Sequence, residues 1–420
     1  MKFRNIGQVL LASVVSVGLC LGVTSCSTSF TVGFLYVVGA STSNGASGQI
    51  SGFKIDNDNG RLTPITKSPF STAGANPIRA VMFPGGRFLY VLNSKPTGTA
   101  GGNIALFTVG GNGLLTFQES YSSQGANPVS IAAGSNGADF IYVLDQEVHD
   151  ANGNVINSGN GAITVFSVDP NTGRLSLVTN QQVLTSGGSQ LTYFPVGNKP
   201  TAFGPIANST IVGSYIYTVD ADQSVFPYAI NASNGQLTVT PNGPQPTGAT
   251  HISAIGGNSS NVFLLDAGNG GHSTILPYTR GPNGSLQTVV GGAIPNDPTV
   301  TNPSDLVVDS KGKFLYIANA GPNNNPANPA SAISAYSILP NATSGLLTAV
   351  GGEPFPSGSQ PVCILEDPSN QYIYTANHSD STVTGRKIDT NTGVLNDLVK
   401  GSSIATTGSP TWCVVTGRTQ

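Results

Sequence analysis

The hydrophobic and polar positions of this chain repeat one pattern along most of its length. The clearest copy is 302–319, where two short apolar runs, 306–308 and 314–318, flank the polar turn 309–313. Short apolar runs joined by a polar turn that contains a glycine are typical of a strand–turn–strand unit. The repeated pattern therefore predicts a protein built from short antiparallel strands.

Three marks recur in a constant order: a proline that opens an apolar run, an aromatic strand, and a Gly-x-Leu turn. The prolines are Pro77, Pro128, Pro200, Pro303, Pro361 and Pro410, with His251 in this place in the fifth unit. The central residues of the aromatic strands are Tyr36, Tyr90, Tyr142, Tyr217, Phe263, Tyr316 and Tyr374. The glycines of the turns are Gly60, Gly113, Gly173, Gly235, Gly284, Gly345 and Gly393.

The spacing of these marks predicts the architecture. The central aromatic residues follow one another at steps of 54, 52, 75, 46, 53 and 58 residues. Such steps are close to the period of about 40–50 residues, plus loops, that is typical of a propeller blade. A third strand, such as 162–168, precedes each Gly-x-Leu turn, a weaker fourth follows it, and helical periodicity is absent. The sequence predicts an all-β protein, a seven-bladed β-propeller of four-stranded antiparallel blades.

The two ends of the repeated region have complementary deficits. The first unit begins directly with its aromatic strand, 34–38, whereas the chain ends with an unpaired proline-led strand, 410–415. Pairing these segments leaves no sheet edge open. We therefore expect one propeller domain, 34–420, whose C-terminal strand completes blade one.

Long insertions are predicted to gather on one rim of the ring. Because successive strands are antiparallel, the loops 146–161 and 320–331 and the long link 183–199 lie on the same side. Irregular loops on a regular scaffold are common places for binding. This variable rim is the predicted functional face.

The N-terminal segment has the pattern of an export signal. Lys2 and Arg4 precede an apolar stretch, 9–23, and the sequence Val-Thr-Ser before Cys26 resembles the lipobox of bacterial lipoproteins. We predict a signal peptide, 1–25, a tether, 26–33, and a lipid on Cys26 that anchors an exported protein at the periplasmic or cell-surface side. The alternative is an ordinary secretory signal with an incidental cysteine.

Composition excludes some functions. Only 9% of residues are charged, and the formal net charge is −3. No dense cluster of lysine and arginine is present, so nucleic-acid binding is not expected. No cofactor motif occurs, and Asp56 to Gly60, which begins like a calcium loop, lacks the glycine and glutamate positions of that motif. We expect no cofactor and no metal.

Two cysteines are predicted to meet. Cys20 leaves with the signal peptide, which leaves Cys363 and Cys413 on the inner strands of blades seven and one. These blades are neighbours in a closed ring, and export favours a disulfide beside the central channel. Such a bond would close a 50-residue loop, with a stabilisation of about 3–4 kcal/mol. Two buried free thiols are the alternative.

Over residues 34–418 these marks resemble the seven-bladed lactonase family, which includes 6-phosphogluconolactonase-like proteins, and the related YVTN-type repeats. The resemblance rests on the proline-led strand, on Gly-Lys/Arg-Phe-Leu-Tyr-Val-x-Asn and on Thr/Asn-Gly-x-Leu. It implies hydrolysis of a sugar lactone. Members of the family carry Pro-Arg-His on an inner strand and Asn-Glu after an aromatic strand, and neither motif occurs in this chain.

Candidate site residues lie on the inner strands and the variable rim. Arg79 and Asp305 stand second after their prolines, where a side chain can face the channel and orient an anionic ligand or a water molecule, or simply line the channel. Trp412, the one tryptophan, can stack on a sugar or lactone ring or pack at the ring closure. His251 joins Arg79 and Asp305 as a candidate catalytic residue.

Further binding candidates lie on the connections of the variable rim. They are His149, His272, His378 and Glu147, and exposed polar loops are the alternative. The spacing of the four histidines matches no metal-ligand pattern.

Two functional hypotheses follow. The first is an exported lactonase-like hydrolase that acts on a small lactone at the channel mouth. The second is a non-catalytic propeller that binds a glycan or a protein partner through its variable rim.

Overall fold

The computed structural model describes residues 30–41, 46–94, 102–134, 139–149, 155–156, 159–205, 214–258, 260–268, 273–321, 331–339 and 346–417. The candidate residues Cys26 and His272 lie outside these ranges. The chain divides into Met1–Phe30 and the compact unit Thr31–Gln420, and all the strands belong to the second unit.

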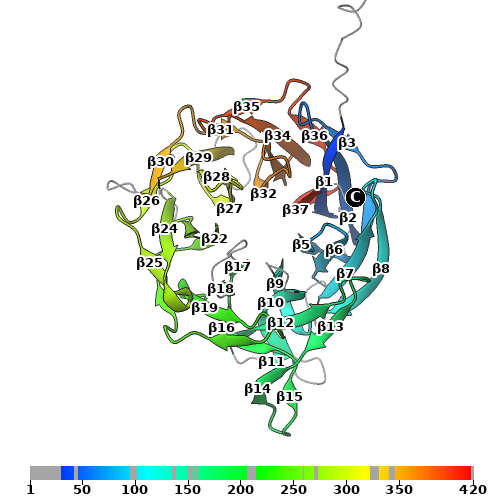
Figure 1. Cartoon of the computed structure of the whole chain (residues 1–420), viewed down its shortest axis with the longest axis vertical. Coiled ribbons are helices and arrows are strands. Elements are labelled where there is room, and N and C mark those ends of the chain that lie inside the picture. The colour runs from blue at the N-terminus through cyan, green and yellow to red at the C-terminus, as the bar shows by residue number, and fades with distance from the viewer. Residues whose placement is uncertain are drawn as a thin grey trace, which may run out of the picture. The chain divides into compact units, whose positions relative to one another are not determined.

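Seven antiparallel sheets follow one another around the axis of this unit, as predicted for a seven-bladed propeller (Figure 1). The inner strands are β37 (Ser409–Gly417), β5 (Pro77–Met82), β9 (Gly125–Ala133), β17 (Ala202–Pro205), β22 (Ile252–Gly257), β27 (Pro303–Val308) and β32 (Pro361–Glu366). The second strands are β1 (Thr31–Ala40), β6 (Phe88–Asn93), β10 (Phe140–His149), β18 (Ser214–Val219), β23 (Asn261–Asp266), β28 (Phe314–Asn319) and β33 (Tyr372–Asn377). The third strands are β2 (Ser47–Asp56), β7 (Asn103–Val109), β12 (Asn160–Val168), β19 (Ser224–Ile230), β24 (Thr274–Arg280), β29 (Ala332–Ile338) and β34 (Thr382–Ile388).

The outer strand of most blades is broken into two short pieces that both pair with the third strand. The first pieces are β3 (Leu62–Pro64), β13 (Leu175–Val178), β20 (Leu237–Val239), β25 (Leu286–Thr288), β30 (Leu347–Ala349) and β35 (Leu395–Asp397). The second pieces are β4 (Phe70–Ala75), β16 (Phe194–Asn198), β21 (Gln245–Pro246), β26 (Ile294–Pro295), β31 (Phe355–Pro356) and β36 (Ser403–Ala405). Blade two instead has the continuous strand β8 (Leu115–Ser122).

Three strands lie outside this scheme, all in blade three. The strand β11 (Val155–Ile156) extends the edge of β10, and β14 (Asn180–Leu184) pairs with β15 (Gln190–Leu191) in a hairpin that projects from the ring (Figure 1). Of the described residues, one segment is helical, the single 3-10 turn Pro282–Gly284. No helix in the described part of the chain is long and apolar enough to span a membrane.

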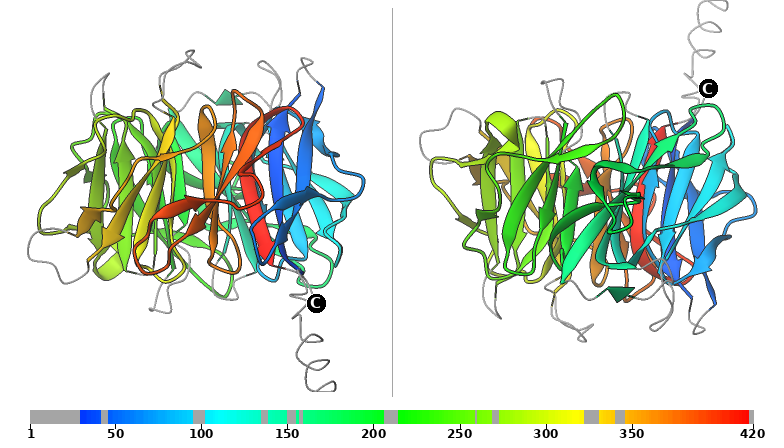
Figure 2. Two further views of the ribbon diagram at one scale, coloured as in Figure 1. Left: turned by 90° about the horizontal axis from the view of Figure 1, so that it is seen from above. Right: turned by 90° about the horizontal axis from the view of Figure 1, so that it is seen from below.

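Ring closure is as predicted from the two ends of the repeat. Strand β37 pairs antiparallel with β1, from Gly33 opposite Gly417 to Ala40 opposite Ser409. Each inner strand also contacts the inner strands of the blades before and after it, so the ring is continuous. The views along the edge of the ring show the strands running between its two rims (Figure 2).

The second strands form most of the core. Every residue of β6, β23, β28 and β33 is buried. Each blade packs against a neighbour on both of its faces, so these strands need apolar residues at every position rather than at alternate ones. This explains why the aromatic strands appear in the sequence as short continuous apolar runs.

The aromatic strand of one blade is tied to the glycine turn of the next. The hydroxyl of Tyr36 donates to the carbonyl oxygen of Gly113 at 2.8 Å, and Tyr316 donates to Gly393 at 3.0 Å. The glycine is required at this turn. Gly113 has φ of 83°, and a Cβ on it would lie 2.5 Å from Cδ1 of Phe34 in the preceding blade. Two of the three recurring marks are therefore two halves of one contact between blades.

One assignment made from the repeat is wrong. His251 was placed where the other units have a proline, but Ile252 has that place. Ile252 pairs with Asp266, just as Pro303 pairs with Asn319 and Pro361 with Asn377. His251 precedes the strand by one residue and lies exposed. The repeat alone could not show that Ile252 holds this position, because the fifth unit has no proline to mark the first residue of its inner strand.

Candidate functional site

A β-bulge near the start of the inner strands selects the residues that gather around the ring axis. In blade six Pro303 pairs with Asn319 and Asp305 pairs with Ala318. The inner strand therefore advances by two residues while the second strand advances by one, which is a β-bulge. The same irregularity occurs in blades seven, one and two. The residues after the bulge in these four consecutive blades are Asp305, Cys363, Trp412 and Arg79. We call this set the axial site.

Arg79 reaches from blade two to the inner strand of blade one. The Cζ atom of its guanidinium lies 3.7 Å from the ring centroid of Trp412, a distance that allows a cation–π interaction. Both side chains are half-buried. Burial lowers the pKa of Arg79 and the charge of Asp305 raises it. An arginine starts from so high a pKa that it stays a cation.

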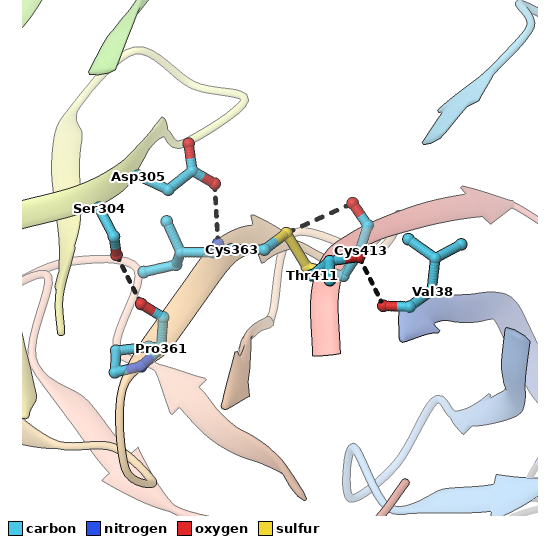
Figure 3. Close-up of a disulfide and its surroundings, with 8 residues drawn as sticks. Val38, Ser304, Asp305, Pro361, Cys363, Thr411 and Cys413 are labelled. Carbon is cyan, nitrogen blue, oxygen red and sulfur yellow. Dashed lines mark hydrogen bonds between the residues drawn. A yellow bond between two sulfur atoms is a disulfide. The ribbon is translucent and has the colours of Figure 1, made fainter. Parts of the chain in front are cut away.

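Asp305 reaches from blade six to the inner strand of blade seven. Its Oδ2 atom accepts a hydrogen bond of 3.0 Å from the amide of Ile364 (Figure 3). Burial raises the pKa of Asp305 to about 6, while the charge of Arg79 and this hydrogen bond act in the lowering direction. Asp305 is therefore mostly ionised at neutral pH, and it is a stronger base than an ordinary aspartate.

The two opposite charges influence each other without forming an ion pair. The ion pairs within 4.0 Å among the described residues are Arg174 with Glu119 and Arg386 with Asp397, and neither involves the axial site. Arg79 is instead placed by Trp412, and Asp305 by a backbone amide. Both polar groups therefore remain available to a ligand.

The predicted disulfide joins the middle of this arc. Cys363 and Cys413 are bonded, with their Cα atoms 5.9 Å apart, so the bond links the inner strands of blades seven and one (Figure 3). Beside it the hydroxyl of Ser304 donates to the carbonyl oxygen of Pro361 at 2.6 Å. Blades six, seven and one are thus cross-linked where Asp305 and Trp412 are held.

Among the described rim candidates His251, His378 and Glu147, no hydrogen bond joins a side chain to Arg79 or Asp305. The backbone amide of His251 donates to Asp266 at 2.8 Å. The Nδ1 atom of His378 lies 2.8 Å from the carbonyl oxygen of Pro410, so this histidine links blade seven to blade one. Glu147 accepts a hydrogen bond of 2.9 Å from Asn127. His149 ends β10, and its side chain lies outside the described part of the structure.

Buried acids at one position of the blades were not found from the sequence. Asp145 lies within β10 of blade three and is fully buried, and burial raises its pKa well above the usual range. The corresponding residues of blades two, six and seven are Asn93, Asn319 and Asn377. Blades four and five have the buried Asp220 and Asp266 at this position, so an acid where other blades have asparagine was the available signal. No group of three or more histidine, cysteine, aspartate or glutamate side chains in the described ranges is arranged to hold a metal ion.

Comparison with known proteins identifies the protein family. The family model described as lactonase, 7-bladed beta-propeller, matches residues 34–143 and 282–415, more than half of the chain. The chain therefore belongs to the lactonase family of seven-bladed β-propellers. The unmatched stretch between these segments contains blade four and the projecting β14–β15 hairpin.

The individual relatives share only a small fraction of their sequence with this chain. A 6-phosphogluconolactonase of Formosa agariphila is 25% identical over 335 residues, which cover 76% of this chain and 85% of that protein. The Pseudomonas aeruginosa periplasmic gluconolactonase superposes with a TM-score of 0.65 at 16% identity, over 92% of this chain and 100% of that one. A protein from Lactobacillus plantarum superposes with a TM-score of 0.64 at 15% identity, over 92% and 100% of the two chains. These two structural likenesses show the fold alone.

Proposed function

We propose that this chain is an exported hydrolase that opens a small sugar lactone at the axial site, with Asp305 as the general base and Arg79 as the group that stabilises the oxyanion. The observation that carries the proposal is that Asp305 and Arg79 lie in the same site without forming an ion pair. A base with a pKa of about 6 and a stacked guanidinium share one arc and do not neutralise each other by contact.

The reaction requires one water molecule and no other co-reactant. Asp305 accepts a proton from water as the water oxygen bonds to the carbonyl carbon of the lactone. Negative charge then develops on the former carbonyl oxygen, where a nearby guanidinium lowers the energy of the transition state. The bond between this carbon and the ring oxygen breaks, and the proton on Asp305 passes to the released alkoxide. The product is the open hydroxy acid.

The charge of the site favours an uncharged sugar lactone over a phosphorylated one. Arg79 is the one cation of the axial site, and Asp305 balances its charge. The indole of Trp412 offers an apolar face to a sugar ring. The name of the Pseudomonas aeruginosa relative, a periplasmic gluconolactonase, supports the same choice.

Export and anchoring belong to this proposal. The disulfide supports it, because such bonds persist in oxidising compartments.

The test is proton release from a panel of sugar lactones, with the chain from Ser27 onward as the enzyme. We expect Asp305→Asn to lose about 10²- to 10⁴-fold in kcat. We expect Arg79→Gln to lose activity as well. Lys311→Gln, on an exposed turn at the opposite rim, is the matched control and should keep full activity.

Three results would change this picture. No rate above buffer for any lactone would reject the hydrolase and favour the hypothesis of a glycan- or protein-binding propeller. Full activity in both axial variants would keep the enzyme and reject this site. Loss of activity in Lys311→Gln would show that the assay reports folding rather than chemistry.

A further inference from the structure

A cavity of about 180 Å³ lies at the seam between blades seven and one, away from the axial site. Leu62, Leu398 and Ile404 give it an apolar part. Its polar lining consists of Arg61, Lys400, Gly401, Ser402 and Ser403. None of these described lining residues is acidic. We call it the seam cavity.

The cavity exists because the outer strand of blade seven is built differently. Ile404 pairs with Val383, at the position where Phe70 pairs with Ile50 in blade one. The chain takes six steps from Leu398 to Ile404 but five from Ile65 to Phe70. Blade six repeats the pattern of blade one, with five steps from Val350 to Phe355. A longer turn and a smaller side chain leave the space open.

Gly385 lines the cavity beside Tyr374 and Leu398. A Cβ atom at this position would lie 2.7 Å from Cδ1 of Leu398 and 2.8 Å from Cε1 of Tyr374. Any larger residue would push these two side chains out of place. The glycine therefore makes room for these two side chains, which line the cavity, and blade one has Gly52 at the same position opposite Tyr36.

The longer turn also changes the hydrogen bonding of the backbone. In blades one, five and six the amide at this turn donates to the carbonyl three residues earlier, namely Ser68 to Ile65, Gly292 to Val289 and Glu353 to Val350. Within the described chain, Gly401 in blade seven makes no such bond, and its φ is 87°. The backbone N–H of Gly401, which lines the cavity, therefore donates no hydrogen bond within the turn.

The two cations of the cavity have no ion-pair partner among the described residues. Arg61 is exposed and forms no ion pair, whereas Arg174, at the same place in the Gly-Arg-Leu turn of blade three, pairs with Glu119 at 3.2 Å. Lys400, contributed by the other blade, is also exposed and unpaired. Two such cations with hydroxyl groups and a free amide form a favourable environment for a carboxylate.

We propose that the seam cavity binds a sugar acid, that is, a carboxylate on a small hydroxylated body. The volume of about 180 Å³ suits one monosaccharide rather than a longer chain. The carboxylate lies between Arg61 and Lys400, and a hydroxyl group binds Ser403, because the hydroxyl of Ser402 already accepts from Leu398 and donates to Asp397. This assignment does not depend on the proposed hydrolase. The bound acid bridges the two blades whose junction closes the ring, so it stabilises the folded state.

Calorimetric titration with glucuronate, glucose and sulfate tests the assignment. Glucuronate has both a negative charge and a hydroxylated sugar ring. Glucose has the sugar ring without the charge, and sulfate has negative charge without the sugar ring. We expect glucuronate to bind, sulfate to bind more weakly and glucose not to bind. Arg61→Met and Lys400→Met should each weaken glucuronate binding about three- to tenfold, the range for one exposed charge-assisted contact. Arg174→Met is the matched control and should bind as wild type.

A second variant fills the cavity and leaves both cations in place. Ile404→Phe restores the residue type of blades one and six and should abolish binding, while its melting temperature shows whether it folds. Equal binding of glucose and glucuronate, or of sulfate and glucuronate, would overturn the ligand class. Unchanged binding in Arg61→Met, or loss of binding in Asp305→Asn, would overturn the location.

Discussion

The hydroxyl of Tyr374 donates a hydrogen bond of 2.7 Å to the carbonyl oxygen of Gly60, although 314 positions separate the two residues in the chain. Tyr374 lies in the last blade and Gly60 in a turn of the first. The same contact joins blades one and two, two and three, four and five, and six and seven, for example from Tyr36 to Gly113 and from Tyr90 to Gly173. Ring closure therefore uses the contact that joins neighbours elsewhere, together with the disulfide and the pairing of β37 with β1.

Removal of this hydroxyl should weaken the closure. Tyr374→Phe leaves the buried carbonyl of Gly60 without its donor, so we expect a loss of about 1 kcal/mol in the free energy of unfolding. Tyr142→Phe is the matched control, because its buried hydroxyl has no partner among the described residues and its removal should be neutral or slightly stabilising. Denaturant titration of both variants measures the difference. Equal losses would show that the hydrogen bond contributes nothing specific.

Gly60→Ala should cost more than Tyr374→Phe. Gly60 has φ of 68°, and an added Cβ would lie 2.5 Å from Cδ1 of Tyr372. Backbone strain of this kind costs about 1–3 kcal/mol, before the displaced ring is counted. Gly85→Ala, where a Cβ meets nothing within 4 Å at φ of 88°, separates the backbone strain from the clash. Thermal melts of the two variants should differ, and identical melts would remove the clash from the explanation.

The disulfide should stabilise the propeller mainly through its loop. It closes 50 residues, for which the chain-entropy relation gives about 3–4 kcal/mol. We expect the double variant Cys363→Ser/Cys413→Ser to lose this stability and to be insensitive to reductant. The wild type should fall to the same midpoint of denaturation when it is reduced. A wild type that keeps its midpoint under reducing conditions would show that β37 closes the ring without help from the disulfide.

Two half-buried glutamates should contribute to a decrease in stability from acid to neutral pH, in addition to Asp145 and Asp305, whose pKa values burial also raises. Burial raises the pKa of Glu353 and of Glu366 to about 7, while hydrogen bonds from Ala335 and Ser310 partly lower them. The folded state therefore holds these protons more tightly than the unfolded state, whose pKa is that of an ordinary glutamate. Their contribution is complete below about pH 4.5 and is lost as pH rises through about 7.

Glutamine at these positions should flatten that dependence. One pKa unit corresponds to about 1.4 kcal/mol, so after solvent screening we expect about 1–2 kcal/mol less decline for each of Glu353→Gln and Glu366→Gln. Melting temperatures between pH 4.5 and 8 measure the slope, and Asp58→Asn on an exposed turn is the control. A slope that both variants leave unchanged would contradict the assignment.

The axial site predicts a characteristic pH–rate profile for the proposed hydrolase. Asp305 must be ionised to act as a base, so kcat/KM should rise with pH through an apparent pKa of about 6. Because the charge of Arg79 lowers the pKa of Asp305, Arg79→Gln should move this limb to higher pH. Trp412→Leu keeps both charges but removes the ring against which Arg79 packs, so it should raise KM and move the limb less than Arg79→Gln does. A limb that does not move in Arg79→Gln would show that a group other than Asp305 titrates.

The sequence by itself determined the class of fold, the number of blades and the closing strand, and it predicted that the two cysteines meet, with two free thiols as the alternative. These features follow from local turn chemistry and from apolar runs of strand length, repeated seven times, so each unit confirms the others. The marks Tyr36 and Gly113 were visible as parts of a pattern. Their contact was not, because nothing in one unit shows which group of the next unit it touches.

Only the tertiary structure decided which side chains meet. A bulge of one residue aligns Arg79, Trp412, Cys363 and Asp305 in consecutive blades, and the same register places Ile252 rather than His251 at the start of β22. One extra residue in the turn before Ile404 opens the seam cavity. Such effects come from shifts of one residue in register, because each shift moves a side chain by a full strand step and changes the neighbour it meets across the gap between blades.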